Sequence, residues 1–164
     1  MLNQETISNN RVENLPLFEH DFYAWTQQQA AILAANRWED LDLANLIEEI
    51  ESLGRQERQE LRNRLCLLIA HLLKWQFQAQ KRSRSWLATI RIQRLDTMDL
   101  LEDNPSLKPY LEEGLERAYK KAIILASKET NLPNKTFPAQ CPYILTDILD
   151  ESFFPGEASD LIDE

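Results

Sequence analysis

Residues 42–80 read DLANLIEEIESLGRQERQELRNRLCLLIAHLLKWQFQAQ, and the architecture of the chain depends on this segment. Its apolar side chains recur at three- and four-residue steps on both sides of a polar run, 54–60. They are Leu43, Leu46, Ile47, Ile50 and Leu53, then Leu61, Leu65, Leu68, Leu72 and Trp75. This spacing predicts a helix with one buried face. A helix over 42–80 would be about 58 Å long, so we expect an elongated bundle or a bend near Gly54, and favour one long helix that bends.

The chain outside this stretch also has the composition and periodicity of helices. Gly occurs three times in 164 residues, and Val12 is the single valine, whereas Leu, Ala, Glu, Gln and Arg are plentiful. Helices are predicted over about 21–35, 83–101, 104–129 and 143–149, with an irregular strap over 130–142. The inner side of the helix over 83–101 is expected to carry Trp86, Leu87, Ile90, Leu95, Met98 and Leu101.

Short polar residues mark the starts of these helices. Asp21 is predicted as an early acidic residue or N-cap, and either Ser83 or Ser85 as an N-cap. Asn104 is a predicted N-cap with Pro105 in the following first turn. The predicted fold class is therefore all-α, an elongated helical bundle of about four main helices plus a short C-terminal helix. We expect a flexible N-terminal arm over 1–18, a single helical domain over 19–155 and an acidic flexible tail over 156–164.

The apolar segments are too short to form a signal peptide or a transmembrane helix, and this bears on the cellular compartment. The first sixteen residues lack an apolar signal core, and the longest apolar run, 65–73, is too short to cross a bilayer. Cys66 and Cys141 indicate neither a disulfide framework nor a zinc site. These observations predict a cytoplasmic protein with no membrane segment, no metal and no cofactor.

Charge is unevenly distributed along the chain. Residues 55–94 contain ten basic and two acidic residues, a net charge of +8, whereas the remainder carries −17. Arg82 and Arg84 near Trp75 and Trp86 could bind a nucleic-acid backbone and stack on bases. The acidic remainder could equally neutralise these cations internally, and with an overall charge of −9 we prefer this interpretation to nucleic-acid binding.

His71 is the one histidine within the predicted core. It could act as an acid–base residue or metal ligand with Glu48 or Glu51, or be a partly buried structural histidine, which we prefer. Glu48 and Glu51 share one side of the predicted helix and either receive basic residues or form a solvated face. The sequence contains no Glu-x-x-His pair for a di-metal bundle and no Gly-rich phosphate loop.

Several separated motifs resemble one known family. They are DFYAW at 21–25, WEDLD at 38–42, NLIEEIESLG at 45–54, HLLKWQ at 71–76, RSRSW at 82–86, NPSL at 104–107 and CPY at 141–143. In this order they resemble the domain-of-unknown-function family DUF29 over about residues 20–155. The resemblance implies an all-helical fold and a bacterial, cyanobacterial source, and it assigns no catalytic residue.

The leading hypothesis is a non-enzymatic module that binds another protein or itself. Two alternatives stay open: a small helical enzyme or metal-binding protein that uses His71 and nearby carboxylates, and nucleic-acid binding through residues 82–94. The candidate binding residues are Glu48, Glu51, His71, Trp75, Arg82, Arg84 and Trp86.

Overall fold

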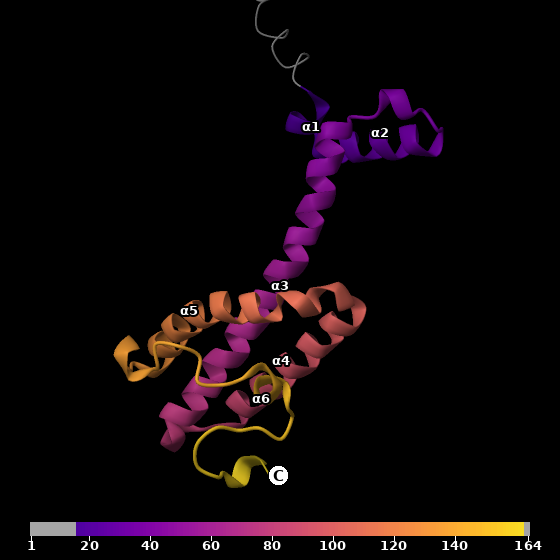
Figure 1. The fold of residues 1–164 in the computed structure, drawn as a ribbon. Helices are drawn as coiled ribbons and strands as arrows, with labels where there is room; N and C mark the ends of the chain where they lie inside the picture. Colours follow the sequence, from indigo (N-terminus) through magenta and orange to yellow (C-terminus); the bar gives the residue numbers. More distant parts are fainter. Residues whose placement is uncertain (1–15, 163–164) are drawn as a thin grey trace, which may run out of the picture. The chain divides into compact units, whose positions relative to one another are not determined.

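The computed structural model describes residues 16–162 and is all-α, without a strand among those residues (Figure 1). The predicted fold class is confirmed. The chain forms two compact units, the first ending at Leu53 and the second beginning at Gly54, and each is described by itself. The predicted domain, 19–155, includes parts of both units, and its boundaries stay a prediction. None of the described helices is both long and apolar enough to span a membrane.

The first unit contains short elements and the start of one long helix. Its elements are α1 (Leu17–His20), α2 (Phe22–Ala34), η1 (Trp38–Asp40) and the beginning of α3 (Leu43–Phe77). The predicted cap at Asp21 is confirmed, since its carboxylate accepts a hydrogen bond from the Ala24 N–H at 2.9 Å. Of the predicted arm, residues 1–15 lie outside the described residues, and Leu17 begins α1.

Trp25 holds α2 against the start of α3 within the first unit. Its indole N–H donates to Asp42 Oδ2 at 3.1 Å, and the Asp42 N–H donates to Gln29 Oε1 at 2.9 Å. The Trp25 ring also stacks on Phe22 and meets Phe18 edge-on. Among the described residues of this unit, only Trp25, Gln29 and Ile32 are buried. The core formed by residues 16–53 is therefore very small.

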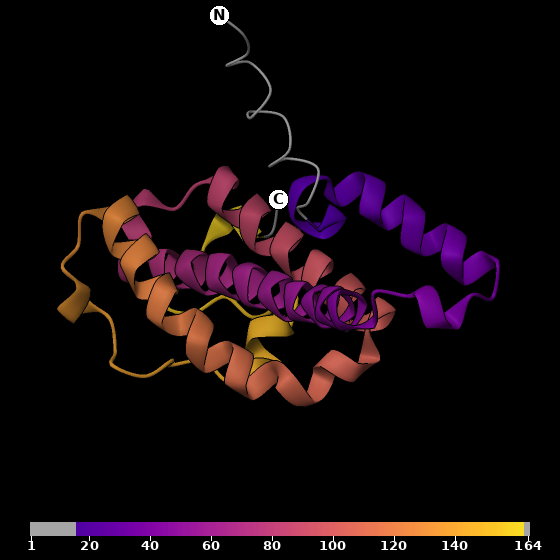
Figure 2. The same ribbon diagram turned by 90° about the horizontal axis from the view of Figure 1, so that it is seen from above.

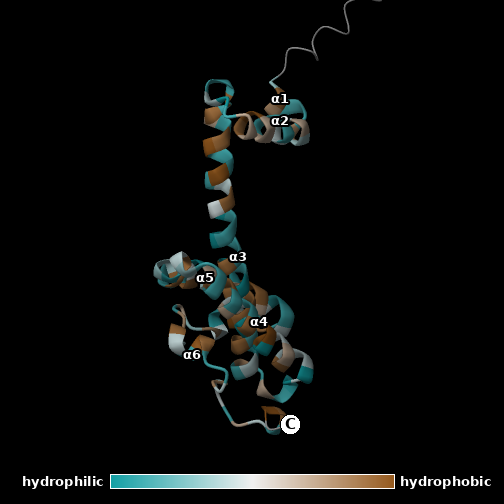
Figure 3. Cartoon of the chain, turned by 90° about the vertical axis from the view of Figure 1, so that its right-hand side faces the viewer, coloured by the Kyte–Doolittle hydropathy of each residue, from teal (hydrophilic) through white to brown (hydrophobic). Residues whose placement is uncertain are grey.

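The apolar stripe at the start of α3 is exposed, so the predicted burial of this face is wrong. Leu43 is 61% exposed, Ile50 67% and Leu53 61%, and Ile47 is exposed as well. Hydrophobic (brown) and hydrophilic (teal) residues alternate along the N-terminal part of α3 in Figure 3. Helical periodicity gives a helix one apolar face, but it does not supply a neighbour that covers that face.

The second unit is a bundle around the C-terminal part of α3. Its further elements are η2 (Ala79–Lys81), α4 (Arg84–Asp103), η3 (Pro105–Tyr110), α5 (Leu111–Thr130), η4 (Asn134–Thr136), α6 (Leu145–Leu149) and η5 (Asp160–Ile162). Figures 1 and 2 show α4 and α5 on two sides of α3. α6 contacts both α4 and α5. The second apolar stripe of α3, which includes Leu61, Leu65 and Leu68, is fully buried there as predicted.

Two details of α4 and of the turn after it differ from expectation. The inner face of α4 carries Arg94 and Thr97, whereas the predicted Leu95 and Met98 are exposed. Asn104 does not cap the next helix through its side chain, because its amide donates to the Leu100 carbonyl at 3.2 Å. That helix begins as a 3-10 segment with an internal proline, which lacks the N–H that an α-helix requires.

Candidate functional site

Three arginines of the predicted basic segment bind backbone carbonyls of the C-terminal segment, residues 148–162. We name Arg82, Arg91 and Arg94 the arginine clasp. Charge neutralisation by acidic side chains was expected for this segment, and it accounts for Arg64, which pairs with Glu60 and Asp96. The clasp instead uses the planar array of guanidinium donors to satisfy several carbonyls at once.

Arg94 is the buried member of the clasp, with 1% of its surface exposed. Its Nε donates to Ile148 O at 2.8 Å, and its Nη2 donates to Phe153 O at 2.6 Å. A longer bond of 3.4 Å joins Nη1 to Glu151 O, and the guanidinium carbon lies 5.1 Å from the centre of the Phe154 ring. Burial lowers the pKa of Arg94 to about 10. Arg94 therefore remains charged at neutral pH while it anchors the turn after α6.

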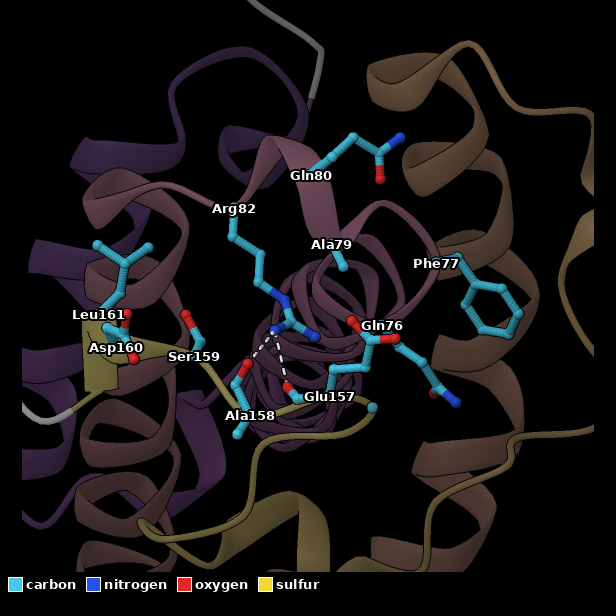
Figure 4. A pocket seen from close by; sticks show the side chains of 11 residues that line it. Gln76, Phe77, Ala79, Gln80, Arg82, Glu157, Ala158, Ser159, Asp160 and Leu161 are labelled. Atoms are coloured by element: carbon cyan, nitrogen blue, oxygen red, sulfur yellow. Dashed lines mark hydrogen bonds between the residues drawn. The ribbon is translucent and has the colours of Figure 1, made fainter.

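Arg82 holds the last part of the described chain. Its Nε donates to Trp75 O at 2.8 Å, and its Nη1 donates to Glu157 O at 2.7 Å and to Ala158 O at 3.3 Å (Figure 4). Gly156 has a φ of +88°, and a Cβ at this position would lie 3.2 Å from Arg82 Nη2. The positive φ favours glycine at this position, and a side chain here would also crowd the guanidinium.

The predicted acidic tail, 156–164, is consequently placed against the second unit as far as residue 162. Arg91 donates to Ile162 O at 3.1 Å, and Leu161 and Ile162 pack on the core. The docking of this segment could not be foreseen from its acidic sequence, because its attachment uses main-chain carbonyls. Its flexibility stays a prediction.

A cavity of about 890 Å³ lies beside Arg82. Figure 4 shows its wall, formed by the end of α3, by Ala79 and Gln80, and by residues 156–161. The Arg82 guanidinium points at the carbonyls of Glu157 and Ala158 across this space. Since these carbonyls already accept its hydrogen bonds, the cation stabilises the fold rather than presenting itself to a ligand.

The second cluster is built around His71 on α3. His71 Nδ1 lies 2.9 Å from Leu67 O, which can only accept, so Nδ1 carries the proton. The other ring nitrogen, Nε2, lies 3.3 Å from Lys74 Nζ and accepts from it. Burial lowers the pKa of His71, and the nearby Lys74 ammonium lowers it further. His71 is therefore a neutral imidazole whose two nitrogens are both engaged at neutral pH.

Lys74 connects His71 to the carboxylate of Glu129 on α5. Lys74 is 3% exposed, and its ammonium contacts Glu129 Oε2 and lies 4.4 Å from the centre of the Trp86 ring. The carboxylate associated with His71 is thus Glu129, which supplants the expected Glu48 or Glu51. Within the described residues, no group of three or more His, Cys, Asp and Glu side chains is placed to hold a metal ion.

The remaining candidate residues are not gathered into one site. Trp75 is 0% exposed and packs 5.4 Å from Phe154, centre to centre, so its ring is unavailable for stacking on a base. Glu48 and Glu51 are exposed on α3 in the first unit, and Arg84 is exposed at the start of α4. Lys74 lies between His71 and the Trp86 ring and contacts both. The guanidinium carbon of Arg82 lies 4.9 Å from the centre of the Trp75 ring.

Sequence reasoning missed Lys74, Glu129 and the structural role of Arg94. Arg94 follows Leu87 and Ile90 at the spacing of the apolar stripe, which is a detectable sign of an inward-facing arginine. Lys74 likewise follows an apolar run. No such sign marks Glu129, because it lies 55 residues beyond Lys74.

Comparison with known families adds to this geometry. Residues 17–154 match the model of the family described as Domain of unknown function DUF29. The chain belongs to the DUF29 family. The resemblance predicted from the sequence motifs is therefore confirmed, and the DUF29 match includes Arg94 with its acceptors up to Phe153. No curated protein and no solved structure matches the chain.

Proposed function

We propose that this DUF29 protein is a non-enzymatic helical module that binds another protein or a second copy of itself. The observation that carries the proposal is the exposed apolar stripe of the first unit. Leu43, Ile47, Ile50 and Leu53 are each 50–67% exposed and recur on one side of α3. Contiguous exposed apolar patches are typical of surfaces at which proteins associate.

Energetics support the same conclusion. The described part of the first unit has 38 residues, 16–53, and three buried side chains. The core formed by these described residues buries little apolar surface, and small cores of this kind usually need association or cross-links to be stable. Covering each half-exposed Leu or Ile would contribute about 1 kcal/mol. A partner on this stripe would thus stabilise the first unit as well as bind it.

The chemistry of the second unit favours a structural role for the other candidate residues. Both ring nitrogens of His71 are occupied by Leu67 O and Lys74. The clasp arginines could bind phosphates only if they broke their hydrogen bonds to backbone carbonyls. Nucleic-acid binding through residues 82–94 would therefore compete with the docking of the C-terminal segment. We therefore do not extend the proposal to catalysis or to nucleic acid.

The proposal is tested by mass measurement and affinity capture with the full chain. We expect either a light-scattering mass above 19.2 kDa or the stoichiometric recovery of another protein from a native lysate. Ile47→Glu should abolish this association, because a carboxylate would be forced into an apolar contact. Ile124→Glu on α5 is the matched control, since Ile124 is 62% exposed outside the stripe. A monomer that recovers no partner would refute the proposal.

A further inference from the structure

A cavity of about 370 Å³ with a basic wall lies between α5 and the part of α3 that belongs to the second unit. Its lining includes Gln59, Arg62 and Asn63 of α3 and Arg117, Lys120 and Lys121 of α5. We name this cavity the basic groove. The described residues that line it include four cationic side chains and no acidic one. Its volume is within the range of sites that bind small molecules.

Like charges are held close together on the α5 side of the basic groove. Arg117 lies three residues before Lys120 and four before Lys121, the spacings at which side chains of a helix meet. Like charges at these spacings destabilise a helix. Arg117 pairs with Glu113 at 2.8 Å. No carboxylate in the described part of the chain pairs with Lys120 or Lys121, so two of the three charges are uncompensated.

Arg62 supplies a positioned cation from the α3 side. Its Nη1 donates to Tyr110 Oη and its Nη2 donates to Gln59 Oε1, both at 2.5 Å. Because both acceptors are neutral, these bonds orient the guanidinium without compensating its charge. Gln59 Nε2 in turn donates to Asn63 Oδ1 at 2.6 Å. Both amide oxygens therefore already accept a hydrogen bond, and Arg62 Nε and Asn63 Nδ2 remain as donors for a ligand.

We propose that the basic groove binds the phosphoryl group of a small anionic ligand. A phosphoryl group carries about two negative charges near neutral pH and offers several acceptor oxygens. It thereby matches a lining that supplies donors and an excess of positive charge. A cleft lined by one sign of charge also raises the local concentration of its counter-ion. This site does not involve the exposed apolar stripe, and it extends beyond the proposed interaction module.

The length of the basic surface favours a compact ligand over a polynucleotide. The cationic residues of α5 that line the groove lie within 117–121, which is about 6 Å along the helix axis. Glu112, Glu113 and Glu116 precede them on the same helix. A nucleic acid gains its affinity from contacts to many successive phosphates, and these carboxylates would repel the phosphates next to the groove. One or two phosphoryl groups match the extent of the basic surface.

Inorganic pyrophosphate is the probe, titrated into the full chain by isothermal titration calorimetry. We expect saturable binding with a Kd below about 1 mM at low salt and weaker binding as the salt concentration rises. The double variant Lys120→Gln/Lys121→Gln should raise this Kd at least about tenfold. Both lysines are exposed, so the variant should fold as the parent does, with an unchanged midpoint of urea unfolding.

The matched control is the double variant Lys128→Gln/Lys135→Gln. It removes the same two charges from exposed positions that do not line the basic groove. The control should bind pyrophosphate as tightly as the parent. An equal loss of affinity in the two double variants would show that net charge alone attracts the anion, and this would overturn the site.

Three other results would also overturn the inference. The first is the absence of saturable pyrophosphate binding to the parent. The second is equally tight binding of citrate, whose charges are carboxylates. The third is tighter binding of an oligothymidine strand or a phosphatidylserine vesicle that is lost in Lys120→Gln/Lys121→Gln, which would assign the groove to a nucleic acid or a membrane surface. None of these results bears on association through the apolar stripe, which Ile47→Glu tests separately.

Discussion

Replacing Arg94 with methionine should release the C-terminal segment from the bundle. Methionine keeps an apolar stem beside Phe154 but removes all the guanidinium donors. The carbonyls of Ile148 and Phe153 then lose their bonds of 2.8 and 2.6 Å. The longer contact with Glu151 O, at 3.4 Å, contributes less.

The expected loss follows from these two shorter bonds. A hydrogen bond that involves a charged group contributes about 1.5 to 3 kcal/mol, so two of them amount to about 3 to 6 kcal/mol. The variant no longer buries a charge, and that relief offsets part of the loss. We therefore expect the free energy of unfolding to fall by about 3 kcal/mol. Arg94→Lys can restore one bond and should recover about half of this.

Urea unfolding followed by circular dichroism measures the change. With a slope of about 2 kcal/mol per molar urea, the midpoint should fall by about 1.5 M. Arg91→Met is the matched control, because Arg91 is exposed and makes one bond to Ile162 O at 3.1 Å, and it should cost less than about 1 kcal/mol. Limited proteolysis should cut the C-terminal segment faster in Arg94→Met alone. Equal stabilities for Arg94→Met and Arg91→Met would refute this account of the clasp.

Two further predictions concern the buried cluster on α3. Burial lowers the pKa of His71 in the folded state below its ordinary 6.5. As pH falls, the unfolded chain therefore takes up this proton before the folded chain does. The stability that the neutral imidazole contributes is complete above pH 6.5 and is lost as pH falls through that value towards the folded pKa. His71→Asn should therefore lose less stability than the parent between pH 7.5 and 5, and equal losses would count against the buried neutral imidazole. Lys74→Met and Glu129→Gln should be coupled by about 1 to 2 kcal/mol in a double-mutant cycle of unfolding free energies, since the two side chains contact one another; additive effects would contradict that contact.

Local sequence was sufficient to predict the helices and where several of them begin. Helical spacing depends on side chains three and four residues apart, and caps depend on a side chain and an N–H two or three residues ahead. The predictions at Asp21 and Ser83 are accordingly confirmed, the latter by a bond of 3.3 Å from the Trp86 N–H. The long helix also continues through Gly54, which agrees with the preference for a single helix over this segment.

The neighbour that each helical face meets depends instead on the tertiary structure. The apolar steps before and after Gly54 look alike in sequence, yet Ile50 is 67% exposed whereas Leu68 is fully buried. Likewise, the charge of a segment does not say whether its arginines meet carboxylates, phosphates or main-chain carbonyls. The partner of a charged side chain depends on which distant segment folds against its helix. Glu129, for example, contacts Lys74 from 55 residues away, and local periodicity cannot predict such a contact.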